Sequence, residues 1–123
     1  MRIIDANILL RYLLEDEPLL AEKAAVILEN GSVYIPFEVL AEVVYVMLGL
    51  YHATRSDISS VLLQLTGQPN VSTSNLSVLQ EALRLFEKKK LDFVDSLLCA
   101  YSRIEGAQIE TFDKKLVKCC SGH

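Results

Sequence analysis

The stretch MRIIDANILLRYLL, residues 1–14, sets the central question about the fold of this chain. Two apolar runs, 3–4 and 8–10, enclose Asp5 and Asn7. The first run predicts a short buried strand over 2–5, and Asn7 predicts the cap of a helix that runs to about Leu14. Because burial of a carboxylate without a partner is costly, Asp5 requires a turn to solvent, a helix cap or a metal ion.

The same alternation of short strands and helices continues along the chain. Apolar runs predict further strands at 32–36, around Val71 and at 108–112. Periodicity, caps and stop signals predict helices at 19–29, 37–50, 56–65 (begun by Ser56 or Asp57), 75–90, 92–106 and 113–120. This order predicts an α/β sandwich with a mostly parallel sheet, and no repeat or linker divides the single domain expected over 1–123.

Composition excludes several classes of protein. The chain has 123 residues, 51% of them hydrophobic, and a net charge of −4, which argues against a broad basic face for nucleic acid. No run of 18 apolar residues and no signal peptide is found, so a cytoplasmic protein without a membrane span is expected. Cys99 is interpreted as a core thiol, and with Cys119 and Cys120 it is expected to be reduced and chemically idle.

Four carboxylates from distant parts of the chain are expected at one edge of the sheet. Asp5 ends the first predicted strand and Asp113 the fourth, Asp95 opens the helix before the fourth strand, and Glu42 lies in the helix after the second. Ligands of parallel α/β sheets bind where the strands end. Clustered carboxylates repel one another, and Mg²⁺ or Mn²⁺, which prefer oxygen ligands, would relieve that repulsion.

Each of these acids also has a structural interpretation. Asp5 is a candidate turn residue before the Asn7 cap, and Asp113 a candidate N-cap of the last helix. Asp95 follows the cap candidate Asp92, where an acid favours the helix dipole. Glu42 is the only charge in VLAEVVYVML (39–48), and Glu38, one turn earlier, is the solvent-exposed alternative.

Other catalytic arrangements are poorly supported. The only histidines are His52, which follows a predicted helix, and His123, the last residue, so a Ser-His-Asp arrangement has little basis. No Gly-rich phosphate loop is present, which argues against nucleoside-triphosphate chemistry.

Four segments resemble, in order and spacing, the motifs of PIN-domain ribonucleases, and in particular those of VapC-like toxins of prokaryotic toxin–antitoxin pairs. They are IIDANILLRYLL (3–14), VLAEVVYVML (39–48), DFVDSLLCAYS (92–102) and TFDKKL (111–116). The resemblance implies a three-layer α/β/α sandwich with a central parallel sheet. It also implies acidic residues that hold Mg²⁺ or Mn²⁺ and hydrolyse RNA phosphodiester bonds.

Carried over to this chain, the resemblance implies a catalytic set of Asp5, Glu42, Asp95 and Asp113. Asp5 and Asp95 would bind the metal, directly or through water. Asn7 matches a polar residue that supports the first acid, and Thr111 one near the last. Candidate contacts to the RNA backbone, which are otherwise ordinary surface charges, are Arg11, Lys114 and Lys115.

Three kinds of partner are expected. The resemblance implies an RNA substrate and a cognate antitoxin that sets an Arg or Lys against the acids and a helix in a groove walled by 7–14 and 37–65. Excess apolar residues on 37–65 predict a homodimer through Val39, Val43, Val46 and Leu50. The alternative function is a non-catalytic α/β interaction module, in which the acids are caps and surface charges.

Overall fold

The computed structural model describes residues 1–122 of the chain. It divides into two compact units, Met1–Ser74 (unit 1) and Asn75–His123 (unit 2), and each is treated by itself. His123 lies outside the described residues. One domain over 1–123 stays a prediction.

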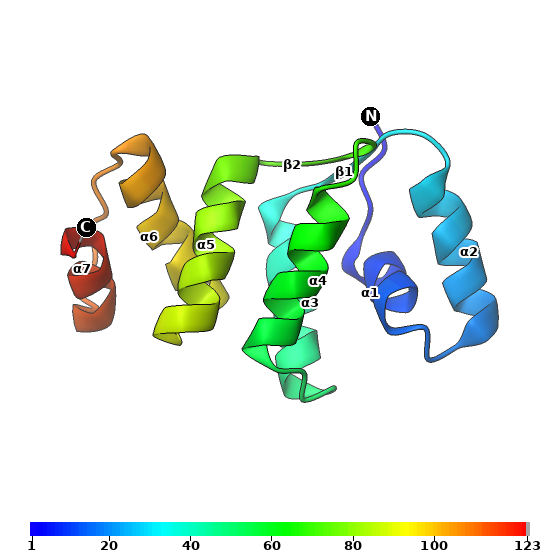
Figure 1. Ribbon diagram of the computed structural model, residues 1–123, viewed down its shortest axis with the longest axis horizontal. Coiled ribbons are helices and arrows are strands. Elements are labelled where there is room, and N and C mark those ends of the chain that lie inside the picture. The colour runs from blue at the N-terminus through cyan, green and yellow to red at the C-terminus, as the bar shows by residue number, and fades with distance from the viewer. Residues whose placement is uncertain (123) are drawn as a thin grey trace. The chain divides into compact units, whose positions relative to one another are not determined.

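Unit 1 holds two pairs of consecutive helices, and a short strand follows each pair (Figure 1). Its elements are α1 (Ala6–Leu14), α2 (Pro18–Glu29), β1 (Val33–Ile35), α3 (Phe37–Gly49), α4 (Arg55–Thr66) and β2 (Val71–Thr73). All of them lie within one to three residues of the ranges predicted from the sequence. The apolar periodicity therefore located the elements of this unit well.

Two helix starts differ from the prediction. Asp5, not Asn7, caps α1, because its Oδ1 accepts the Ile8 N–H at 3.0 Å. Thr54, not Ser56 or Asp57, caps α4 by accepting the Asp57 N–H at 3.0 Å. A cap oxygen reaches the N–H group two or three residues further on, so the true cap stands before the first helical residue.

The sheet of unit 1 is small. β1 and β2 pair in parallel, with Val33 opposite Val71 and Ile35 opposite Thr73. On the other edge of β1, Tyr34 donates its N–H to the carbonyl of Arg2 at 2.8 Å and accepts the Ile4 N–H at 3.2 Å. The strand predicted over 2–5 is thus reduced to an isolated parallel bridge between Ile3 and Tyr34.

The strand predicted at 108–112 is wrong. The structure gives these residues no regular secondary structure, and none of the described residues of unit 2 (75–122) forms a strand. An extended segment without a neighbouring strand has no ladder hydrogen bonds, which are what define a strand. Here the side chain of Gln108 instead donates to the carboxylate of Glu110 at 2.7 Å.

The core of unit 1 lies between the strands and the inner faces of its helices, where α1 packs on α2 and α3. Its fully buried side chains include Leu9, Ile35, Leu40, Val43, Ile58 and Leu62. Val43 was expected at a dimer interface, and that expectation is wrong because Val43 faces this core. Of the other three candidates, Leu50 is 76% exposed and Val39 and Val46 are half-buried.

Unit 2 consists of α5 (Leu76–Lys89), α6 (Phe93–Glu105) and α7 (Lys114–Ser121) (Figure 1). α5 and α6 pack side by side, and α6 also packs on α7. The rings of Phe86 and Phe93 meet edge-on with centroids 6.0 Å apart. Gly106 ends α6 in the left-handed conformation at φ 69°, as a C-terminal glycine commonly does.

A disulfide joins α6 to α7. It links Cys99 and Cys119, whose Cα atoms are 6.1 Å apart, and Cys120 keeps a free thiol. The expectation of three reduced cysteines is therefore wrong in the structure. The two residues are 20 positions apart in sequence, and only the packing of α7 on α6 brings them together.

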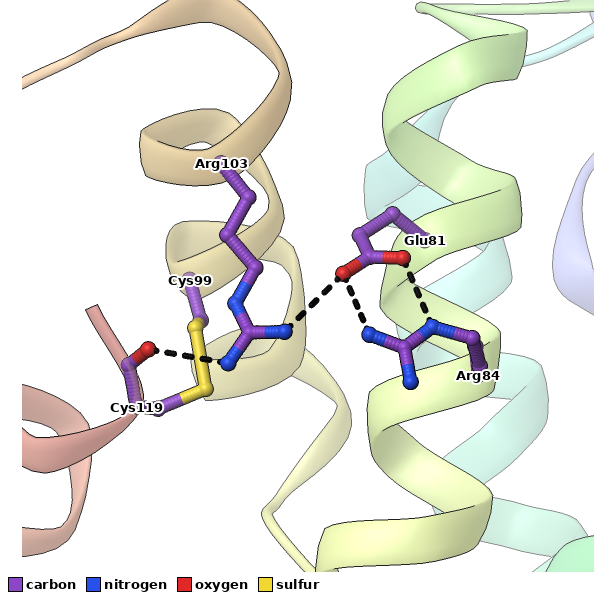
Figure 2. A network of polar contacts seen from close by, with 5 residues as sticks. All are labelled: Glu81, Arg84, Cys99, Arg103 and Cys119. Atoms are coloured by element: carbon purple, nitrogen blue, oxygen red, sulfur yellow. Dashed lines mark hydrogen bonds and ion pairs between the residues drawn. A yellow bond between two sulfur atoms is a disulfide. The ribbon is translucent and has the colours of Figure 1, made fainter. Parts of the chain in front are cut away.

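A polar network lies beside this disulfide (Figure 2). Glu81 of α5 accepts hydrogen bonds from Arg84 at 2.7 and 2.8 Å and from Arg103 of α6 at 3.3 Å. Arg103 also donates to the carbonyl of Cys119 at 3.1 Å. One guanidinium thus ties all three helices of unit 2 together.

No helix over residues 1–122 is both long enough and apolar enough to span a membrane.

Candidate functional site

Asp5 stands where the bridged segment beside β1 enters α1. Its backbone is extended, its side chain is exposed, and its Oδ1 caps the helix through the Ile8 N–H. Exposure and the cap together make the carboxylate tolerable between its apolar neighbours. The cap uses only Oδ1, so Oδ2 takes no part in it. Asn7, the predicted supporting residue, is exposed in the first turn of α1.

Glu42 lies on the exposed side of α3. Glu38, four residues earlier, lies on the same side and is also exposed. Val43 and Val44, which follow Glu42, are buried, so the helix turns its carboxylates away from the core of unit 1. The preference for Glu42 over Glu38 as the site residue stays a prediction.

Asp95 lies in the first turn of α6 and is half-buried. Partial burial, together with the negative charges of Asp92 and Asp113, raises the pKa of its carboxyl above the ordinary value. Asp92 occupies the N-cap position of α6 as predicted, although its side chain makes no capping hydrogen bond. Two further carboxylates of unit 2 therefore act on Asp95.

Asp113 caps α7, as its structural interpretation predicted. Its Oδ1 accepts the Leu116 N–H at 3.1 Å. The hydroxyl of Thr111 accepts the backbone N–H of Asp113 at 3.0 Å, so Thr111 positions the main chain at this residue. The cap does not preclude metal binding, because it leaves Oδ2 uninvolved.

Two of the four predicted acids belong to each unit. Asp5 and Glu42 lie in unit 1, and Asp95 and Asp113 in unit 2. Among residues 1–122, neither unit contains a group of three or more acidic, histidine or cysteine side chains arranged to hold a metal ion. The structure thus brings Asp95 within electrostatic reach of Asp113, and the meeting of all four acids at one edge stays a prediction.

The chemistry of the Asp95–Asp113 pair suits a divalent cation. Both groups are carboxylates, which Mg²⁺ and Mn²⁺ prefer as ligands. The repulsion that raises the pKa of Asp95 is the repulsion that a cation would remove. Each helix N-terminus favours the negative charge of its own acid, so a cation must compete with the helix dipoles.

The three predicted contacts to the RNA backbone differ in their surroundings. Lys114 and Lys115 are exposed in the first turn of α7, directly after Asp113. Arg11 forms ion pairs with Asp16 at 3.2 Å and Glu17 at 2.6 Å. A phosphate would have to replace these carboxylates at Arg11, whereas the two lysines are exposed.

Sequence reasoning missed Phe112, which lies between Thr111 and Asp113. It was interpreted as the last residue of a strand, but its side chain is fully exposed. The signal that was available is its setting, because an aromatic residue followed by Asp-Lys-Lys is unusual for a buried position.

Comparison with known proteins identifies a family. The family model for the PIN domain matches residues 2–120, nearly the whole chain. No curated protein and no solved structure matches the chain significantly. The match includes all four predicted acids, and PIN domains are a family of metal-dependent nucleases that typically bind Mg²⁺. This chain belongs to the PIN-domain family.

Proposed function

We propose that this chain is a divalent-metal-dependent endoribonuclease that hydrolyses RNA phosphodiester bonds. The observation that carries the proposal is the Asp95–Asp113 pair in a PIN-domain chain. The pair combines two carboxylates at the starts of adjacent helices, and Coulomb repulsion from Asp113 contributes to the raised pKa of Asp95. Two exposed lysines follow it and suit a polyanionic substrate.

The residues have distinct proposed roles. Asp5 and Asp95 would hold Mg²⁺ or Mn²⁺, and Glu42 and Asp113 would complete the acidic shell and orient the attacking water. A divalent cation, when bound there, supplies positive charge for the phosphoryl oxygens and lowers the pKa of water. The water attacks phosphorus in line, and a ribose oxygen leaves.

The test is cleavage of structured cellular RNAs by the full chain in Mg²⁺ or Mn²⁺, with EDTA as the control. We expect cleavage that EDTA abolishes, and loss of cleavage in the Asp5→Asn and Asp95→Asn variants. Cleavage that survives EDTA, or survives both substitutions, would refute the assignment of the metal site. A wild-type chain that neither binds the metal nor cleaves RNA would favour the alternative, a non-catalytic α/β interaction module.

Glu38 and Glu42 form a matched pair of variants, because both carboxylates are exposed on one side of α3. We expect Glu42→Gln to reduce cleavage sharply and Glu38→Gln to leave it nearly unchanged. Equal effects would mean that Glu42 has been wrongly assigned to the site.

We further propose that the nuclease is a toxin restrained by a cognate antitoxin. A cleft of about 630 Å³ in unit 1 supports this, since α1 and α4, two of the expected groove walls, contribute Leu13, Val61 and Leu65 to its lining. α2 contributes the third wall in place of α3. The cleft would hold the apolar helix of the antitoxin, whose Arg or Lys would lie against the proposed catalytic acids.

Co-expression with the protein of the neighbouring gene tests the toxin proposal. We expect the partner to co-purify and to suppress RNA cleavage, and alanine at its inserted basic residue to weaken that suppression. Unchanged cleavage and growth inhibition would remove the toxin role and leave a stand-alone nuclease.

The homodimer and the cytoplasmic location also remain proposals. Light scattering at micromolar concentration tests the homodimer.

A further inference from the structure

Phe112 is the most exposed large apolar side chain among residues 1–122. Its exposed fraction is 105%, so none of the described residues of unit 2 covers the ring. Single apolar residues on a surface are common and need no explanation. Phe112, however, stands directly before Asp113, a proposed catalytic acid, so a ligand that covers the ring would lie beside the proposed site.

The backbone holds Phe112 between two fixed neighbours. On its C-terminal side, Asp113 caps α7 through the Leu116 N–H at 3.1 Å, and Leu116 is buried. On its N-terminal side, the Thr111 hydroxyl bridges across Phe112 to the Asp113 N–H at 3.0 Å. The ring is therefore presented from an ordered turn, which lowers the conformational entropy lost when a ligand covers it.

The charges around Phe112 favour a nucleic acid as that ligand. Lys114 and Lys115 follow within three residues and are exposed, so an aromatic face and two ammonium groups lie together on one short segment. Unpaired bases stack on aromatic side chains, and lysines attract the phosphates between them. An apolar protein surface would match the ring but not the two cations.

We propose that Phe112 stacks on an unpaired base of the RNA substrate, with Lys114 and Lys115 close to the adjoining phosphates. The inference rests on the proposed ribonuclease function and narrows its substrate to an unpaired stretch of RNA beside the scissile bond. Phe112 is then a positioning residue, because it holds a nucleotide next to Asp113 and takes no part in proton or water chemistry.

The chain offers a direct spectroscopic test because it contains no tryptophan. Phe112→Trp introduces the only tryptophan, at the proposed stacking position, and it can be excited at wavelengths that the tyrosines do not absorb. The probe is a 12-nucleotide single-stranded RNA, with Ca²⁺ in place of Mg²⁺ to slow cleavage. We expect saturable quenching of the tryptophan by this RNA, and little quenching by a duplex of the same length or by an abasic strand of the same charge.

The matched control is Leu19→Trp, on α2 in unit 1. Leu19 is also well exposed (77%), and α2 carries none of the proposed site residues. Quenching of both tryptophans alike would indicate non-specific collision and would overturn the proposal.

Binding affinity supplies the second measurement. Aromatic stacking on one base is typically associated with about a five- to hundredfold gain in affinity. We expect Phe112→Ala to weaken binding of the single-stranded RNA by that factor and to raise KM more than it lowers kcat. Phe112→Tyr should keep the affinity within about twofold of the wild type. Val117→Ala, at an exposed apolar residue of α7, should have no effect.

The possible outcomes separate this inference from the proposed function. RNA cleavage without quenching, and with unchanged affinity in Phe112→Ala, would overturn the stacking role and leave the ribonuclease. Quenching and weakened binding without cleavage would support the stacking role and remove the ribonuclease. A wild-type chain that binds no single-stranded RNA, or a Phe112→Ala variant whose only defect is in self-association, would overturn the stacking role.

Discussion

Glu81 and Asp95 are both half-buried carboxylates of unit 2, yet their surroundings shift their pKa values in opposite directions. Hydrogen bonds from Arg84, with a further contribution from Arg103, hold the pKa of Glu81 below its ordinary value despite partial burial. Partial burial and two neighbouring acids raise the pKa of Asp95. The same type of side chain is thus stabilised as an anion at one position and destabilised at the other.

This difference in surroundings distinguishes a structural carboxylate, Glu81, from a candidate site carboxylate, Asp95. Around Glu81 the chain supplies its own cations, and the network joins three helices (Figure 2). Around Asp95 it supplies further negative charge, which costs stability unless a cation arrives from outside. Uncompensated charge of this kind is typical of functional sites, where stability is sacrificed for binding.

The largest expected effect is that of Asp95→Asn on RNA cleavage. Loss of even an outer-shell partner of a metal costs 10- to 100-fold, so loss of a ligand should reduce cleavage by about 100-fold or more. Cleavage of a labelled RNA in Mg²⁺ measures this. Glu110→Gln, an exposed acid of the same unit, is the control and should be silent.

In the absence of metal, Asp95→Asn should be more stable than the wild type. Because the folded-state pKa of Asp95 is raised, its ionisation costs stability above that pKa, and the cost disappears as the pH falls below the unfolded-state value. Asp95→Asn should therefore raise Tm at pH 7, with the gain vanishing near pH 3. A lower Tm at pH 7 would show that the carboxylate is compensated after all.

Removal of the disulfide should have the next largest effect. A loop of 20 residues closed by a disulfide contributes about 3 kcal/mol in the chain-entropy model, so the Cys99→Ala, Cys119→Ala double variant should lose about that much unfolding free energy. Chemical denaturation measures it, and Cys120→Ala is the matched control. Because disulfides are rare in reducing compartments, the presence of the Cys99–Cys119 bond needs a direct test. Three titratable thiols in the freshly purified wild type would contradict the bond.

Glu81→Gln should destabilise unit 2 by about 1–3 kcal/mol, because Arg103 is only 13% exposed and would lose its charged partner. Since the folded-state pKa of Glu81 is lowered, its contribution is present above the unfolded-state pKa and is lost as the pH falls through the folded-state value. The wild type should therefore lose its advantage over the variant in acid. Glu87→Gln, whose carboxylate lies 3.8 Å from Lys88, should cost much less.

The smallest expected effect is that of Asp5→Asn on stability. Asparagine caps a helix about as well as aspartate, so the unfolding free energy should change by only a few tenths of a kcal/mol. Asp5→Ala removes the bond to Ile8 and should cost about 1 kcal/mol. A large loss of stability in Asp5→Asn would mean that any loss of cleavage in this variant reflects unfolding and not loss of a metal ligand.

Several features of the fold were predictable from local sequence. The helix ends at Asn30-Gly31 and Gly106, and the cap at Asp113, depend on residues within one turn of each other. The absence of a strand at 108–112 was not predictable in this way, because a strand exists only when a neighbouring strand supplies hydrogen bonds. The cap at Asp5 was missed because Asp5 and Asn7 are both good caps, and only the backbone path decides between them.

The candidate site shows the same limit. Asp5, Asp95 and Asp113 could be named from their positions near predicted strand ends and helix starts, and Glu42 as the only charge in an apolar helix. The PIN-domain match covers all four. Their surroundings could not be named. Asp92 acts on Asp95 from the start of the same helix, but the influence of Asp113 on Asp95 and the full exposure of Phe112 depend on how the helices of unit 2 pack.

The sequence by itself thus determined the order of the helices, the positions of the two strands β1 and β2, the candidate acids and the family. The tertiary structure alone decided the Cys99–Cys119 bond, the opposite pKa shifts of Glu81 and Asp95, the burial of Val43 and the exposure of Phe112. The physical reason is the distance along the chain over which each interaction acts. Helix periodicity and caps act over three or four residues, whereas burial, Coulomb energy and sulfur pairing depend on which distant side chains the packing sets opposite one another.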